Sequence, residues 1–131
     1  MGVSSIPMLL LLALLLTAPA GDAVVLQGSY VTGDAEYPDE GQIVATFTPR
    51  GDAIWAVVFD FDFQESDYRF EGTATGSLDD GALTGSVQNA SGERTFTFAG
   101  TVSDGRFEGT HAEIEYGSET PTGTMTLRRR D

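Results

Sequence analysis

The sequence predicts an all-β domain in which eight antiparallel strands run up and down in chain order and close into a small barrel. Three observations predict this fold. Apolar and polar residues alternate with a period of two from residue 24 nearly to the C-terminus. Turn dipeptides that contain glycine interrupt this alternation at regular spacing. Glycines also recur on the apolar face of the strands, where a tightly curved sheet needs them. A two-sheet β-sandwich, which needs them less, is the alternative fold.

The first twenty residues are predicted to be a signal peptide. A run of leucines with one alanine follows the methionine at position 8 and ends at position 16. This run matches the apolar region of a signal peptide and is too short to span a bilayer as a helix. Small residues precede the expected cleavage point after Ala20, and Ala23 is the second choice. We therefore expect an exported protein, secreted or periplasmic, with residues 21–131 forming a single β-barrel domain.

Eight segments show the alternation that is typical of strands. The turns at 80–81, 91–92 and 104–105 suit two-residue hairpins, because each ends in a glycine that accepts a positive φ. A two-residue turn sets the register of its two strands, and each resulting pair keeps apolar residues or glycines on one face. The predicted strands are 24–33, 41–49, 53–63, 67–79, 82–90, 93–103, 106–116 and 122–129. The predicted pairs include Leu78–Leu83, Gly76–Gly85, Val87–Phe96, Val102–Phe107, Phe61–Phe70, Asp62–Arg69 and Val44–Val58.

One face of these strands carries the bulky apolar side chains and is predicted to form the barrel interior. The opposite face is rich in threonine, serine and acidic residues. The predicted interior residues are Leu26, Tyr30, Ile43, Phe47, Trp55, Val57, Phe59, Phe61, Phe63, Phe70, Leu78, Leu83, Val87, Phe96, Phe98, Phe107, Met125 and Leu127. The glycines expected on the same face are Gly28, Gly72, Gly76, Gly85, Gly100 and Gly109.

The composition excludes several classes of partner. With 20 acidic residues against 7 basic ones and a net charge of −13, the surface repels nucleic acid and anionic membranes. The chain has no cysteine, so the hydrophobic core and the hydrogen-bond ladder alone must hold the domain. No cofactor motif is present, and a single histidine cannot form a multi-histidine metal site. We therefore expect neither a nucleic-acid partner nor a cofactor.

The predicted architecture resembles that of the calycins and the avidin group, which are small eight-stranded barrels. Residues 80–85, which read Asp-Gly-Ala-Leu-Thr-Gly, resemble an avidin-type hairpin. The lipocalin signature Gly-x-Trp on the first strand is not matched, because Trp55 lies on the third predicted strand and Ala53 stands two residues before it. The resemblance concerns architecture, and architecture alone does not imply function.

The leading functional hypothesis is that the barrel binds a small apolar or aromatic ligand. A barrel of eight strands is just wide enough to hold one small molecule if its lining leaves space. Interior glycines beside many aromatic rings favour such a space. The residues predicted to form the wall are Tyr30, Trp55, Phe59, Phe98 and His111.

His111, the only histidine of the chain, pairs with Phe98 in the predicted register, and Glu113 follows on the same face. A histidine and a glutamate on one face are the residue types of an acid–base pair, or of the polar end of a ligand site. The alternative is a β-bulge near Ala112, which would turn Ile114 and Tyr116 inward and Glu113 outward, with a His111 that is satisfied by hydrogen bonds near the barrel mouth. No nucleophile motif is present, so we expect a protein that is not an enzyme.

Two further features of the outer face are candidates for binding. Asp60 with Asp62, and Asp79 with Asp80, carry oxygen ligands of the kind calcium prefers, although neither spacing matches a known calcium loop. A solvated acidic surface is the simpler interpretation of both pairs. The aliphatic residues Val44, Ile54 and Val58 favour a contact between copies of the chain, and ordinary strand surface is the alternative.

Two other functional classes stay open. A structural or interaction domain would have a filled core and would act through its outer surface. A small outer-membrane barrel would turn the apolar face outward to lipid. The short turns, the mid-strand aromatic residues and the charged C-terminus argue against membrane insertion.

Overall fold

The computed structural model describes residues 21–33 and 36–130, and this part of the chain consists of strands and turns. The predicted signal peptide, residues 1–20, lies outside the described residues. Within the described ranges, no helix has the length and apolar character needed to cross a membrane. The strands are β1 (Val24–Thr32), β2 (Asp39–Gly51), β3 (Ile54–Phe63), β4 (Ser66–Gly76), β5 (Gly81–Gln88), β6 (Thr95–Ser103), β7 (Arg106–Glu115) and β8 (Ser118–Arg129).

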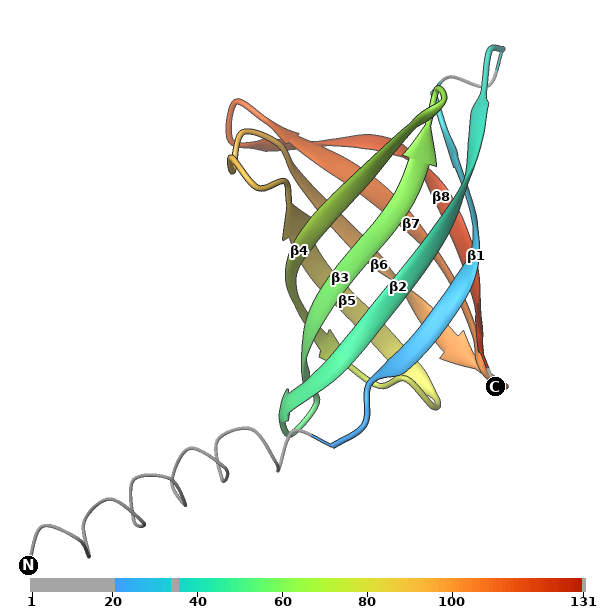
Figure 1. The fold of residues 1–131 in the computed structure, drawn as a ribbon, viewed down its shortest axis with the longest axis vertical. Coiled ribbons are helices and arrows are strands. Elements are labelled where there is room, and N and C mark those ends of the chain that lie inside the picture. The colour runs from blue at the N-terminus through green and yellow to red at the C-terminus, as the bar shows by residue number, and fades with distance from the viewer. Residues whose placement is uncertain (1–20, 34–35, 131) are drawn as a thin grey trace, which may run out of the picture.

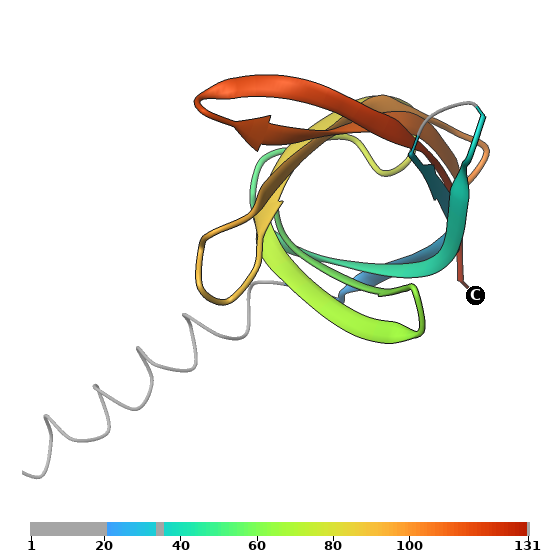
Figure 2. The ribbon, with the colours of Figure 1, turned by 90° about the horizontal axis from the view of Figure 1, so that it is seen from above.

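The eight strands form one closed antiparallel barrel in chain order (Figure 1). Each strand pairs with its neighbours in the sequence, and β1 pairs with β8 to close the sheet. Viewed along the barrel, the strands surround a common axis as a ring (Figure 2). The predicted up-and-down barrel is therefore confirmed, and the sandwich alternative is wrong. Closure leaves no strand of the sheet with an unpaired edge.

The two ends of the barrel are defined by alternate connections. We call the end that carries the β1–β2, β3–β4, β5–β6 and β7–β8 connections the mouth. The other end, which carries the β2–β3, β4–β5 and β6–β7 connections, is the base. Both ends of the described chain lie at the base, where the backbone N–H of Arg130 donates to the carbonyl oxygen of Val25 at 2.8 Å.

The predicted register holds for β5, β6 and β7. Val87 lies opposite Phe96, and Val102 lies opposite Phe107. Asp104 and Gly105, the two residues of the β6–β7 turn, have φ values of 50° and 73°, as this hairpin geometry requires. The turn chemistry therefore decided the pairing at this hairpin, as the sequence predicted.

The predicted register is shifted by two residues between β3 and β4. The turn between these strands is Gln64–Glu65, and both residues adopt a positive φ although neither is glycine. Phe59 therefore lies opposite Phe70, and Arg69 lies opposite Asp60 instead of Asp62. A shift of two residues keeps every side chain on its predicted face, so the interior is unchanged.

Two other pairings show the same shift. Gly76 pairs with Leu83, because the β4–β5 connection is longer than the predicted two-residue turn. Its Ser77 hydroxyl accepts hydrogen bonds from the backbone N–H groups of Asp79 and Asp80 at 3.1 and 3.0 Å. On the outer face, Val44 lies opposite Asp60 instead of Val58.

The interior is the apolar face that the alternation predicted. Every predicted interior residue is either buried or packed against the buried cluster. Phe47, Phe107, Leu26, Leu83 and Leu127 are among the most completely buried side chains. The alternation thus identified the barrel interior correctly, because each strand has one face toward the axis and one toward solvent.

Candidate ligand pocket

The mouth of the barrel contains an apolar pocket of about 120 Å³. This volume is close to the ~150 Å³ of a dry apolar cavity that holds one benzene molecule. Most of its wall is aromatic. The wall includes Tyr30, Ile43, Phe59, Phe61, Phe70, Phe96, Phe98, His111 and Met125.

The base of the barrel is closed by packed side chains. Leu78, in the β4–β5 connection, is buried although it is not part of a strand. Trp55 also lies at this end, where its indole N–H donates to the carbonyl oxygen of Gly76 at 3.0 Å. The barrel interior is therefore filled by side chains at the base and hollow at the mouth.

The pocket rings contact one another along the wall. The ring centroids of Phe59 and Phe98 are 5.0 Å apart, and Phe61 stands 5.4 Å from Phe70. Phe98 is seated over Gly85, where a Cβ atom would come within 2.5 Å of the ring. Glycine at position 85 thus gives Phe98 its place at the floor of the pocket.

Tyr30 contributes a hydroxyl group to the pocket wall. This hydroxyl donates to the backbone carbonyl oxygen of Asp62, which ties β1 to the mouth end of β3. Burial, and then the negative charges of Asp62 and Asp39, raise the pKa of Tyr30 to about 12. The phenol is therefore neutral at physiological pH, and the environment of its oxygen opposes negative charge.

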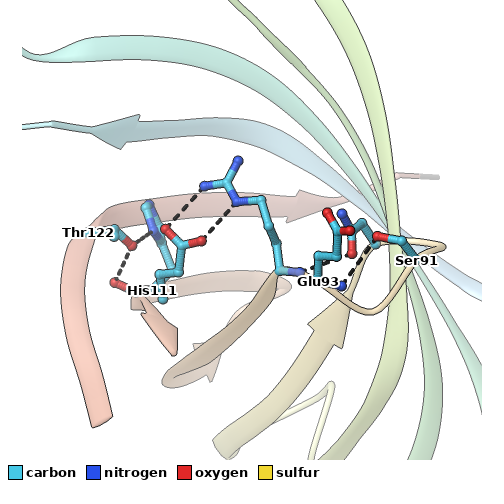
Figure 3. A network of polar contacts seen from close by, with 7 residues as sticks. Ser91, Glu93, His111 and Thr122 are labelled. Atoms are coloured by element: carbon cyan, nitrogen blue, oxygen red, sulfur yellow. Dashed lines mark hydrogen bonds and ion pairs between the residues drawn. The ribbon is translucent and has the colours of Figure 1, made fainter. Parts of the chain in front are cut away.

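His111 joins three strands at the side of the pocket. From β7, its Nε2 atom reaches the carbonyl oxygen of Val31 in β1 at 3.1 Å, and its Nδ1 atom lies 2.6 Å from the hydroxyl of Thr122 in β8. Figure 3 shows His111 beside Thr122, with the contact drawn as a dashed line. The His111 ring lies over Gly123, its pairing partner on β8, and Gly123 has no side chain that would block the ring. His111 therefore connects β7 to both β1 and β8, whose pairing closes the barrel and is called the seam.

The bulge that produces this arrangement lies on β8. Between the pairs His111–Gly123 and Ala112–Pro121, β8 has one extra residue, Thr122. The predicted bulge near Ala112 is therefore present, with its extra residue on β8, while β6 and β7 stay in register through the pair Phe96–Glu113. Tyr116 does not turn inward and is fully exposed.

The hydrogen bonds of His111 suit a neutral ring. The Val31 carbonyl oxygen can only accept, so Nε2 carries the proton. The Thr122 hydroxyl has one hydrogen for two acceptors: it donates to the His111 carbonyl oxygen at 3.0 Å, or it turns to Nδ1 of the neutral ring, 2.6 Å away. Burial lowers the pKa of His111, an effect that its backbone hydrogen bonds oppose in part.

We expect His111 to make stability dependent on pH. Because the folded pKa lies below the usual 6.5, the unfolded chain binds more protons as the pH falls through the range beneath about 6.5. Stability from the neutral ring should be fully present above that pH and should decline below it. The midpoint of urea unfolding, followed from pH 8 to pH 5, measures this decline.

His111→Gln is the control for this prediction, because its amide does not titrate. Protonation of the many carboxylates also changes stability at low pH, but it does so in both proteins. The difference in midpoint between wild type and H111Q should therefore shrink as the pH falls. A difference that is constant from pH 8 to pH 5 would contradict the prediction.

Arg94 lies at the rim of the pocket. Its guanidinium forms two hydrogen bonds with the Glu113 carboxylate, at 2.8 and 3.1 Å, and stands 5.1 Å from the centre of the Phe96 ring. The pKa of Arg94 is raised above its usual value, chiefly by the bond to Glu113. Figure 3 shows the neighbouring loop residues Ser91 and Glu93 next to this network.

Four of the five predicted wall residues meet in this pocket. Tyr30, Phe59, Phe98 and His111 all line it. Trp55 does not, because it lies at the base. Sequence reasoning placed Phe61, Phe70 and Phe96 on the inner face but did not assign them to the site, since the alternation does not show which end of the barrel stays open. Nothing in the sequence pattern pointed to Arg94.

The predicted aspartate pairs have other partners in the structure. Asp60 accepts from Arg69 at 2.8 Å, and Asp62 accepts from the backbone N–H of Gln42 at 2.7 Å. Asp79 pairs with Arg129 at 3.2 Å. Across residues 21–33 and 36–130, no group of three or more potential metal ligands comes together.

Comparison with known proteins gives no further identification of this barrel. No known family profile matches the sequence, and no curated protein sequence matches it either. Its functional assignment therefore depends on the geometry of the pocket.

Proposed function

We propose that this protein is an exported barrel that binds one small apolar or aromatic molecule in the pocket at its mouth. The observation that carries the proposal is the difference between the two ends of the barrel. The base is packed to closure, whereas the mouth keeps an aromatic pocket of about 120 Å³. An apolar pocket of this kind, with a few polar groups at its edge, is the usual form of a small-molecule site.

The polar groups near the pocket favour binding over catalysis. Both ring nitrogens of His111 are engaged by Thr122 and Val31, and the carboxylate of Glu113 is engaged by Arg94. His111 and Glu113, which the sequence suggested as an acid–base pair, therefore each bind a different residue. We propose a protein without enzymatic activity on this basis.

The other functional hypotheses receive less support from the geometry. An outer-membrane barrel would need its aromatic face outside, whereas the core rings point into the barrel. A purely structural domain would have no need for a hollow mouth. The contact between copies of the chain through Val44, Ile54 and Val58 stays a prediction. The 46% exposure of Ile54 favours it, whereas the position of Val44 opposite the charged Asp60 does not.

Binding of toluene, a one-ring apolar probe, tests the proposal. Met125 lines the pocket, so its methyl NMR signal, assigned by its loss in Met125→Leu, reports occupancy. We expect saturable shifts of this signal in the wild-type protein. Phe61→Ala removes a wall ring and should weaken binding by about fivefold, the equivalent of one aromatic contact.

Trp55→Ala is the matched control, because Trp55 is also partly buried and aromatic but lies at the base. Its affinity for toluene should stay within about twofold of wild type. The absence of any saturable shift, or an equal loss of affinity in both variants, would refute the pocket as the binding site. Native mass spectrometry of the protein from its own host would identify the natural ligand. The intact mass of the chain would test cleavage after Ala20.

A further inference from the structure

The charges of this protein are distributed unevenly between the two ends of the barrel. Three mouth segments, 36–40, 60–67 and 113–119, are rich in acidic residues and contain no basic one. Five of the seven arginines lie at the base: Arg50, Arg106, Arg128, Arg129 and Arg130. The aromatic pocket therefore opens at the more acidic end of the described barrel.

The arginines nearest the mouth do not offset this charge across the whole rim. Arg69 pairs with Asp60, and Arg94 pairs with Glu113. Asp62 and Asp67 lie directly opposite each other beside the β3–β4 turn, and neither has an arginine partner among the described residues. Like charges in this position destabilise a strand pair, so the rim holds repulsion that a bound cation would relieve.

Two groups of the pocket wall report the sign of the electrostatic potential there. The negative charges of Asp62 and Asp39 help to raise the pKa of Tyr30, which means that negative charge is disfavoured at its oxygen. Nearby Glu113 and Glu115 favour the charged form of Arg94. The same surroundings thus oppose an anion and favour a cation.

Arg94 also shows how the pocket rim holds a positive charge. Its guanidinium lies 5.1 Å from the centre of the Phe96 ring while Glu113 binds it from the side. Attraction between a cation and an aromatic face is the interaction that recognises ammonium groups in aromatic cages. The other pocket rings and the remaining carboxylates of the rim offer the same pair of contacts to a ligand.

We propose that the ligand of this pocket is a small organic cation, with one apolar group of about ring size in the pocket and an amine or quaternary ammonium at the acidic rim. This inference rests on the proposed binding function and specifies its ligand class. The pocket volume of about 120 Å³ limits the buried part to one ring or a short alkyl chain. The charges of the rim select the group attached to it.

Three one-ring probes that differ in charge test this inference: benzylammonium, benzyl alcohol and benzoate. Binding of each to the full chain is followed by the Met125 methyl signal at low ionic strength. We expect benzylammonium to bind about tenfold more tightly than benzyl alcohol, and benzoate to bind most weakly. At 0.5 M NaCl the advantage of benzylammonium should fall to about twofold, because salt screens charges at an exposed rim.

Two matched triple variants locate the effect. Asp39→Asn, Asp62→Asn and Asp67→Asn together remove three negative charges at the mouth. Asp52→Asn, Asp80→Asn and Asp104→Asn remove the same charge at the base, and all six residues are exposed. The mouth variant should lose about fivefold or more in affinity for benzylammonium, and the base variant no more than about twofold.

The outcomes separate the two proposals. If none of the three probes shifts the Met125 signal, the proposed binding function fails, and the ligand class fails with it. If benzyl alcohol or benzoate binds as tightly as benzylammonium, the pocket stands and the cation proposal is overturned. Equal losses in the mouth and base variants would also overturn it, because the preference would then arise from net charge alone.

Discussion

Replacing Gly123 with alanine is expected to destabilise the barrel by about 3 kcal/mol or more. A Cβ atom at this position would lie 1.8 Å from the carbonyl oxygen of Val31 and 3.0 Å from Cε1 of His111. The first contact is with backbone, so β1 and β8 would have to separate to relieve it. The same movement would break the bond between His111 and Val31. Chemical unfolding measures the loss, and hydrogen exchange of β1 and β8 should locate it at the seam.

Gly51→Ala is the control for this prediction. A Cβ atom at position 51 would meet only the end of the Ile54 side chain, at the ordinary distance of 3.9 Å. Its unfolding free energy should stay within about 0.5 kcal/mol of wild type. Equal effects of the two alanines would show that the seam does not depend on the missing side chain of Gly123.

Replacing Phe98 with alanine is expected to cost about 3–5 kcal/mol of stability and to enlarge the pocket. Phe98 is buried, contacts the ring of Phe59 and lines the pocket floor over Gly85. Its loss removes buried apolar area and leaves space that is continuous with the mouth. The variant should therefore bind two-ring aromatic probes, such as naphthalene, that are too large for the wild-type pocket of about 120 Å³. Urea unfolding and the Met125 methyl signal measure the two effects.

Phe107→Ala separates the loss of core from the change in the pocket. Phe107 is as deeply buried as Phe98, but it does not line the mouth pocket. We expect a similar loss of stability, also about 3–5 kcal/mol, without binding of naphthalene. Phe98→Leu, which keeps most of the apolar side chain, serves if the alanine variant does not fold. Naphthalene binding to both alanine variants would contradict the assignment of Phe98 to the pocket floor.

The turns show why register was predictable at some hairpins and not at others. Asp104-Gly105 is a two-residue turn with the residue types that this geometry prefers, and the pairs beside it were predicted correctly. Gln64–Glu65 forms an equally short turn without glycine, so the sequence carried no signal for its position. At Ser77–Asp80 the turn is longer than the dipeptide Asp80-Gly81 suggested. These errors were shifts by two, and the strand period therefore preserved every face.

The candidate site was likewise only partly predictable from the sequence. Alternation was sufficient to place Phe59, Phe98 and His111 inside the barrel, because a strand in a closed sheet has only two faces. It could not show which end of the barrel stays hollow, so Trp55 at the base was grouped with residues at the mouth. The binding partners of His111 were also beyond the sequence, since Val31 and Thr122 come from two other strands at the seam.

The sequence by itself determined that the chain is an eight-stranded barrel and which side chains fill it. Both properties follow from local features, namely the period of two and the short turns, which act over a few residues. Only the tertiary structure decided which end stays hollow, where the bulge lies and where the charges gather. These features depend on strands that are distant in the sequence, and the contacts between such strands exist only once β1 has met β8.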